Sequence, residues 1–242
     1  MAYSGRRRVD TAIVTALNAE AQAVLNAFDI PRKTLYGGTP FGANQPVFFG
    51  KGSGRALYAT GVGTVAAAVG LHLLLSRVAP MHLVCGGIGG TTHEELQIAT
   101  PIVAARCSYY DRDASALSVP YGALTRRTPA SFDLPAGARV AERVGADAGT
   151  FTTGDCFVDT DLLKTLPARW RDRVREAHIV DMESAAWVEE ALNFGIQPIV
   201  IRTVSDTIGT PPGGNRHAFT AACRSFGLYA RRIVERVDRR SF

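Results

Sequence analysis

Two acidic clusters flank an apolar stretch in the last third of the chain. Asp181 and Glu183 open the segment DMESAAWVEEALNF, and Ser205 and Asp206 follow the apolar run PIVIRTV. A desolvated carboxylate is costly unless it is paired or put to use. Carboxyl groups at both ends of a buried unit can transfer protons or stabilise positive charge, so they mark a candidate catalytic site.

The segments around these clusters alternate between short Val- and Ile-rich runs and stretches with helical periodicity. Strands are predicted at residues 11–16, 46–49, 56–59, 81–87, 100–106 and 198–204. Helices are predicted at 18–28, with Asn18 as a possible N-cap, at 64–78, at 183–194 and over a closing segment that includes 222–237. A glycine-rich turn is predicted at 37–46, and loops between about 111 and 150.

This alternation predicts an α/β fold with a mostly parallel sheet that helices cover on both faces. The chain has 242 residues, 46% of them hydrophobic, and no linker divides it, so we expect a single domain over residues 1–242. Sheets of this kind bind ligands at the carboxyl ends of their strands. Those ends carry residues 17–20, 61–64, 86–90 and 205–206.

Composition disfavours a membrane protein and a nucleic-acid-binding protein. The longest apolar segment, 65–75, is interrupted by His72, and the N-terminal MAYSGRRRVD is charged without an apolar core after it, so we expect a cytoplasmic protein with no membrane partner. The net charge of +5 comes from arginines that acidic residues interleave and no aromatic platform accompanies. Solvated helix faces explain them better than nucleic-acid binding.

The cysteines point away from a metal site. Cys85, Cys107, Cys156 and Cys223 form no CxxC pair and have no histidines nearby at ligand spacing. We therefore expect reduced thiols, with neither a disulfide framework nor a bound metal.

The segment GVGTVA, residues 61–66, matches the dinucleotide-binding fingerprint and raises the alternative of a nicotinamide-dependent oxidoreductase. That fingerprint also requires an acidic residue at the end of the next strand, and HLVCGG has none. A tight turn that lets a helix pack closely explains both glycines and the alanine. We therefore expect no cofactor.

Six motifs resemble, in order and over nearly the whole chain, those of the nucleoside phosphorylase and nucleosidase superfamily, most closely its methylthioadenosine/S-adenosylhomocysteine nucleosidase branch. They are TALNAE (15–20), GVGTVAAA (61–68), GGIGG (86–90), TTGDCFV (152–158), VDMESAA (180–186) and RTVSD (202–206). The resemblance implies a three-layer α/β/α fold around a twisted, mixed central sheet. It also implies cleavage of the N-glycosidic bond of a purine nucleoside with a modified 5′ position.

The resemblance assigns roles to the carboxylates. Asp206, oriented by Ser205, would protonate the leaving purine as general acid. Glu183 would bind the ribose hydroxyls and stabilise the positive charge that develops on the sugar, with Met182 packed on the sugar. Glu20 would take a proton from the attacking water. Without the resemblance, each carboxylate also fits a place at a helix N-terminus.

The resemblance also outlines the rest of the pocket. Phe157 would stack on the base, although it could equally belong to the core, and the backbone of Val158 would address the purine edge. Gly87 occupies a place where the nucleosidases usually have serine. The segment with Leu117 and Val119 resembles the loop that closes the 5′ pocket from a partner subunit, but these two residues replace aromatics. We therefore expect a homodimer and leave open a methylthio, futalosine-like or 5′-deoxy substrate.

Phosphorylases of this superfamily hold phosphate with arginines beside the first strand turn and before the GGIGG-like loop. Residues 15–28 contain no arginine, and the strand MHLVC ends without one. Arg202 lies inside PIVIRTV, where we expect a buried acid to pair with it. Water is therefore the predicted nucleophile, and a phosphate-dependent phosphorylase and a catalytically silent nucleoside-binding protein are the alternatives.

Overall fold

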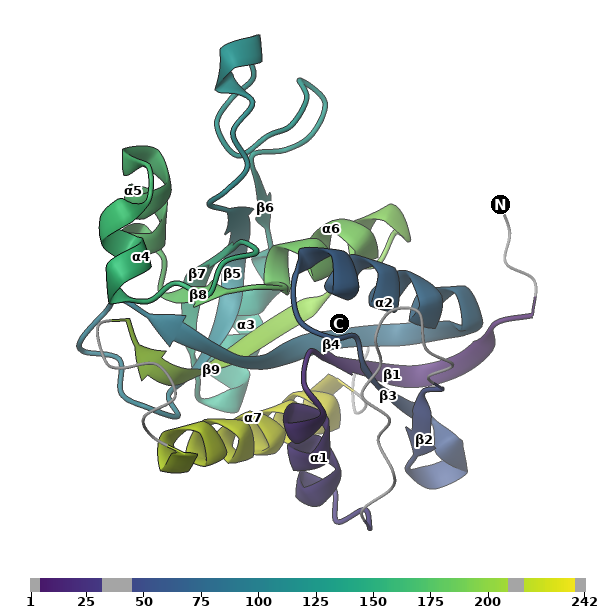
Figure 1. Ribbon diagram of the computed structural model, residues 1–242. Coiled ribbons are helices and arrows are strands. Elements are labelled where there is room, and N and C mark those ends of the chain that lie inside the picture. Colours follow the sequence, from purple (N-terminus) through teal and green to yellow (C-terminus); the bar gives the residue numbers. More distant parts are fainter. Residues whose placement is uncertain (1–4, 32–44, 209–215, 238–242) are drawn as a thin grey trace.

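A twisted sheet runs through the centre of the computed structural model, which describes residues 5–31, 45–208 and 216–237 (Figure 1). The strands of this sheet are β1 (Arg7–Thr15), β2 (Val47–Phe49), β3 (Arg55–Ala59), β4 (Val78–Thr91), β5 (Pro101–Tyr109), β6 (Ser131–Asp133), β7 (Asp147–Thr153), β8 (Ile179–Asp181) and β9 (Ile199–Thr207). The order is β2-β3-β1-β4-β8-β7-β5-β6, with β9 paired to both β4 and β5. Parallel and antiparallel pairs both occur, so the sheet is mixed.

Helices cover both faces of the sheet (Figure 1). They are α1 (Asn18–Ala27), α2 (Thr64–Arg77), α3 (Pro135–Val144), α4 (Thr160–Thr165), α5 (Ala168–Glu176), α6 (Ser184–Asn193) and α7 (Arg216–Val237), with short 3₁₀ turns η1 (Lys51–Ser53) and η2 (Ser115–Leu117). None of the helices within the described ranges is long and apolar enough to cross a membrane.

Two separate cores confirm the three-layer α/β/α arrangement. On one face, α2 and α6 bury Leu71, Leu74 and Trp187 against the sheet. On the other face, α1 and α7 bury residues such as Leu25 and Phe226. The last five residues of β1 are all buried, as expected for a strand that is covered on both sides.

The strands around β4 bring their carboxyl ends together. β4 runs parallel to β1 and β9, whereas β8 meets β4 antiparallel at a single pair, Gly90 and Val180. This pair lies near the carboxyl ends of both strands. β7 runs parallel to β8 and ends beside Asp181. The sheet twist thus collects the ends of β1, β4, β7, β8 and β9 around one region.

The prediction of loops over 111–150 is wrong for its second half. That segment contains β6, α3 and the start of β7. Helix α3 begins with Pro135, which resembles a break in the sequence but suits the first turn of a helix. Strand β7 reads DAGTFTT and lacks the Val and Ile that marked the other strands. Pairing with β5 and β8 makes it a strand, and a single sequence does not show that pairing.

Two smaller expectations also change. The N-cap of α1 is Leu17, and Asn18 is the first helical residue. Glu183 is the N-cap of α6, which begins at Ser184. The turn predicted at 37–46 lies outside the described residues except for its last two positions.

Candidate active site

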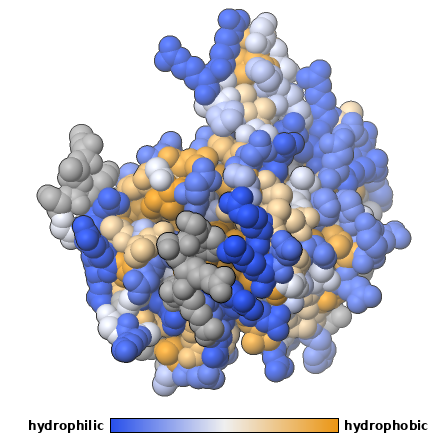
Figure 2. All heavy atoms as spheres, turned by 180° about the vertical axis from the view of Figure 1, so that it is seen from behind, coloured by the Kyte–Doolittle hydropathy of each residue, from blue (hydrophilic) through white to orange (hydrophobic). Residues whose placement is uncertain are grey.

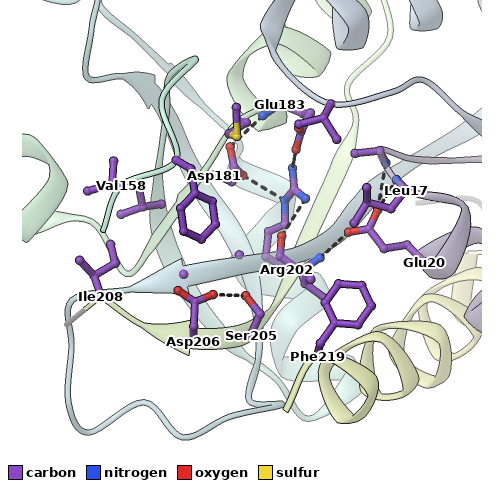
Figure 3. Close-up of a pocket in the computed structure, with 18 of the residues that line it drawn as sticks. Leu17, Glu20, Val158, Asp181, Glu183, Arg202, Ser205, Asp206, Ile208 and Phe219 are labelled. Carbon is purple, nitrogen blue, oxygen red and sulfur yellow. Dashed lines mark hydrogen bonds and ion pairs between the residues drawn. The ribbon is translucent and has the colours of Figure 1, made fainter. Parts of the chain in front are cut away.

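A cavity of about 730 Å³ opens at the carboxyl ends of the strands, a size that suits a small-molecule ligand (Figure 3). It is lined by Ala16, Leu17, Glu20, Val62, Ile88, Gly89, Gly90, Ile98, Cys156, Phe157, Val158, Val180, Asp181, Met182, Glu183, Arg202, Ser205, Asp206, Thr207, Ile208, Ala218 and Phe219. Most of these residues lie in or just after β1, β3, β4, β7, β8 and β9, and Ala218 and Phe219 come from α7. The rule that ligands bind at strand ends therefore located the cavity.

Glu20 is buried at the start of α1 and is held by backbone donors. Its Oε2 accepts hydrogen bonds from the N–H groups of Ala16 and Leu17, at 3.0 and 2.8 Å. Its Oε1 accepts one from the N–H of Ile88, at 2.9 Å. Burial raises the pKa of Glu20 to about 7, although Arg202 and the backbone donors act against this rise. A carboxyl group with this pKa can exchange a proton near neutrality.

Gly87 makes room for the Glu20 carboxylate. A Cβ at position 87 would lie 2.1 Å from Oε1 of Glu20 and 2.5 Å from its carboxyl carbon. Any side chain at this position would therefore displace the carboxylate from the Ile88 N–H. Gly87 itself does not line the cavity, but it lies beside Glu20, which does.

Arg202 lies at the centre of a buried ion cluster (Figure 3). Its Nε donates to Asp181 Oδ2 at 3.0 Å, its Nη2 to Glu183 Oε2 at 2.9 Å, and its Nη1 to the carbonyl of Ile88 at 2.9 Å. The side chains of Arg202 and Asp181 are each only 1% exposed. Burial alone would lower the pKa of Arg202, but the surrounding carboxylates outweigh it and raise that pKa. The prediction that Arg202 pairs with a buried acid is confirmed.

Both carboxylate oxygens of Glu183 accept hydrogen bonds. Oε2 pairs with Arg202, and Oε1 accepts a hydrogen bond from the N–H of Gly63 at 2.9 Å. Burial raises the pKa of this carboxyl, while Arg202 and the Gly63 N–H oppose the rise. The side chain is thereby held at the cavity wall in a single orientation.

Asp206 owes its orientation to an irregularity in β9. The register against β4 passes from Gly89–Val204 to Gly90–Asp206, so Ser205 is an extra residue on β9. Neighbours on a regular strand point to opposite faces, but a bulge re-aims them. Here the Ser205 hydroxyl donates to Asp206 Oδ1 at 2.5 Å, and both residues line the cavity (Figure 3).

A sequence model of the Phosphorylase superfamily matches residues 10–237. The chain belongs to this superfamily. A curated relative, the 5′-methylthioadenosine/S-adenosylhomocysteine nucleosidase of Maridesulfovibrio salexigens, is 26% identical over 205 residues, which cover 81% of this chain and 85% of the relative.

Solved structures of the superfamily share the fold. The Helicobacter pylori 5′-methylthioadenosine/S-adenosylhomocysteine nucleosidase superimposes with a TM-score of 0.77 at 19% identity, over 96% of this chain and 100% of that one. A mutant of the Helicobacter pylori futalosine hydrolase gives a TM-score of 0.74 at 20% identity, over 95% and 99% of the two chains. The expected α/β/α fold is thus confirmed.

Most residues that the superfamily motifs singled out meet in the cavity. The lining includes Glu20, Phe157, Val158, Met182, Glu183, Ser205 and Asp206. Leu117 in η2 does not line it and is 72% exposed. The role expected for Leu117, in a loop that closes the 5′ pocket of a partner subunit, stays a prediction.

Some lining residues carried no signal in the sequence. Ile98 and Ile208 lie in irregular segments, and Phe219 comes from the first turn of α7. No periodicity or motif marks them, because only the packing of distant segments brings them to the cavity.

Among the residues that the structure describes, no group of three or more His, Cys, Asp or Glu could hold a metal ion.

Replacing Arg202 by methionine should lower the free energy of unfolding by about 3–5 kcal/mol, because it leaves Asp181 and Glu183 buried without a countercharge. Urea denaturation measures the effect. Arg106→Met is the control, since the pair of Arg106 and Asp133 is more than half exposed and a surface pair contributes about 1 kcal/mol or less. Equal unfolding midpoints for the two variants would contradict the central role of Arg202.

Proposed function

We propose that this chain is a purine nucleosidase that hydrolyses the N-glycosidic bond of an adenosine-type nucleoside with a modified 5′ position. The observation that carries the proposal is the arrangement of Glu20, Glu183 and Asp206 around one cavity. Membership of the superfamily and similarity to a nucleosidase support the reaction type.

The departing base needs a proton, because a purine anion is a poor leaving group. Asp206 lines the cavity and accepts a hydrogen bond from the Ser205 hydroxyl, which orients its carboxyl group to act as general acid toward a purine nitrogen. Phe157 lines the same cavity and is 59% exposed, which leaves its ring available for stacking on the base.

The ribosyl group becomes positively charged as the bond breaks. Glu183 is fixed by Arg202 and Gly63, so the carboxylate is already in place to accept hydrogen bonds from ribose hydroxyls. A preorganised anion of this kind stabilises the developing charge without having to reorganise during the reaction. Met182 lies next to it in the lining and would cover the sugar.

Water suits the site better than phosphate as the nucleophile. Arg202 is the single basic residue among the described lining residues, and Asp181 and Glu183 already pair with its guanidinium. A phosphate dianion would require a cation that can face it. Glu20, with a pKa of about 7, can instead take a proton from water.

Apolar residues in the cavity lining support an uncharged 5′ substituent such as an alkylthio group. Leu17, Ile98, Ile208 and Phe219 contribute apolar walls. Among the relatives that share the fold are both methylthioadenosine/S-adenosylhomocysteine nucleosidases and a futalosine hydrolase. The apolar walls favour methylthioadenosine, because its 5′ substituent is uncharged.

A homodimer is part of the proposal. The segment with η2 projects from the body of the molecule (Figure 1), and seen from behind it presents hydrophobic residues among hydrophilic ones (Figure 2). Leu117 in η2 is exposed, and so are Val62, which lines the cavity, and Val65, at 52% and 67%. Apolar residues exposed in this way favour contact with a second subunit.

Incubation with 5′-methylthioadenosine should release adenine and 5-methylthioribose at a rate independent of phosphate. Chromatography of the products with and without phosphate measures this. Formation of a ribose 1-phosphate derivative, at a rate that saturates with phosphate, would show a phosphorylase instead.

Asp206→Asn should lower the rate of adenine release by about 10²- to 10⁴-fold if the residue is the general acid.

The pH profile should report Glu20. Below a pH of about 7 the Glu20 carboxyl carries a proton and cannot accept another, so kcat/KM should fall there by roughly tenfold per unit of pH. Glu20→Gln should abolish hydrolysis at every pH while adenine still binds, as measured by calorimetry. A wild-type profile that stays flat down to pH 5 would remove Glu20 from the mechanism.

Sedimentation velocity should show a dimer at the concentrations of the activity assay. Leu117→Asp should weaken the dimer and raise KM for methylthioadenosine, because a charge then replaces an apolar side chain at the expected contact. A fully active wild-type monomer would rule out the dimer proposal.

A further inference from the structure

We infer that Asp155 is a positioning residue, which holds the base-facing loop of residues 155–158 against the N-terminus of α2. The inference deepens the proposed function and rests on it only where it concerns the nucleoside. Cys156, Phe157 and Val158 all line the cavity, and Asp155 comes directly before them.

The carboxylate of Asp155 makes two contacts with one residue of α2. Its Oδ1 accepts a hydrogen bond from the N–H of Thr64 at 2.6 Å, and its Oδ2 accepts one from the Thr64 hydroxyl. The N-cap residue of α2, Gly63, has no side chain that could satisfy the helix. A residue 91 positions away thus performs the capping that local side chains usually provide.

The other side of the loop is fixed by residues that follow β5. The N–H of Asp155 donates to Asp111 Oδ2 at 3.0 Å. The Tyr110 hydroxyl donates to the carbonyl of Cys156 at 3.0 Å, and Val158 packs in a small apolar cluster with Tyr110. The loop is therefore held from two sides, by Thr64 on one and by Tyr110 and Asp111 on the other.

Phe157 depends on these anchors more than on its own packing. Phe157 is 59% exposed, whereas the neighbouring Val158 is only 6% exposed. Few side-chain contacts can hold an aromatic ring that is so exposed, so the backbone sets where it lies. Release of Asp155 would let the ring leave the position needed for stacking.

The same turn of α2 also holds the ribose-binding carboxylate. The N–H of Gly63 donates to Glu183, and the next N–H, of Thr64, donates to Asp155. Gly63 has a φ of +94°, and a Cβ there would lie 3.0 Å from Asp155 Oδ1. This turn therefore connects Glu183, the proposed ribose-binding residue, to the base-facing loop of residues 155–158. The Gly61–Ala66 motif thus has a structural role that requires no dinucleotide.

Two readouts separate this role from simple capping of α2. A cap that only stabilised the helix would lower the unfolding midpoint and leave the loop in place. If Asp155 also positions the loop, its loss additionally raises KM for methylthioadenosine and speeds the reaction of Cys156 with a thiol reagent, because the released loop shields the thiol less. This thiol is exposed, while Cys85, Cys107 and Cys223 are buried, so an uncharged reagent such as N-ethylmaleimide labels it selectively in the folded protein.

Asp155→Ala should raise KM by about fivefold, with kcat within twofold of wild type, and should raise the rate of Cys156 labelling by a similar factor, as expected when a capping side chain is lost. Asp155→Asn keeps an acceptor for the Thr64 N–H but removes the charge, so it should restore both values most of the way. If the two variants label equally fast, the charge near the thiol is responsible and the positioning role is wrong.

Asp159→Ala is the matched control. Asp159 caps α4 by accepting a hydrogen bond from the N–H of Leu162 at 2.8 Å, so its loss removes the same kind of contact four residues further along the chain. It should lower the unfolding midpoint but leave KM and labelling unchanged. Wild-type KM and labelling in Asp155→Ala would overturn the inference. Labelling needs no turnover, so it decides the role of Asp155 even if the wild-type protein lacks nucleosidase activity.

Discussion

The buried guanidinium of Arg202 is the interaction on which the rest of the pocket depends. It provides the charge that allows Asp181 and Glu183 to lie in the interior, where an unpaired carboxylate would be strongly disfavoured. It also ties together four elements, since it extends from β9 to β8, to the start of α6 and to the Ile88 carbonyl of β4. The position of Glu183 follows from this cluster.

The backbone of Ile88 links Glu20 to the Arg202 cluster. Its N–H binds the Glu20 carboxylate, and its carbonyl accepts from Arg202. A shift of β4 would therefore move Glu20 and Arg202 together. The absence of a side chain at Gly87 completes this arrangement, because it lets a buried carboxylate lie directly on the strand. The same burial brings the pKa of Glu20 close to neutrality.

Much of the fold and of the site could be predicted from the sequence where local motifs and hydrophobic patterns are clear. The motifs placed Glu20, Glu183 and Asp206 at strand ends, and the location of Arg202 in an apolar strand indicated a buried partner. The prediction was wrong for α3 and β7, because a helix that starts with proline and a strand rich in threonine look like loops without their partners. The sequence did not indicate Ile98, Phe219 or the contact between Asp155 and Thr64, because these residues are far in the chain from the groups that they meet.

The sequence by itself determined the class of the fold, the superfamily and the residue types available for chemistry, since these follow from local periodicity and from motifs a few residues long. Only the tertiary structure decided which donors each carboxylate meets, how deeply Glu20 is buried and where the bulge turns Asp206. Hydrogen bonds and desolvation act over a few ångströms in space, and the residues that supply them here are separated by up to 120 positions along the chain. Periodicity and motifs cannot carry that information, because it arises only when the strands pair and their ends meet.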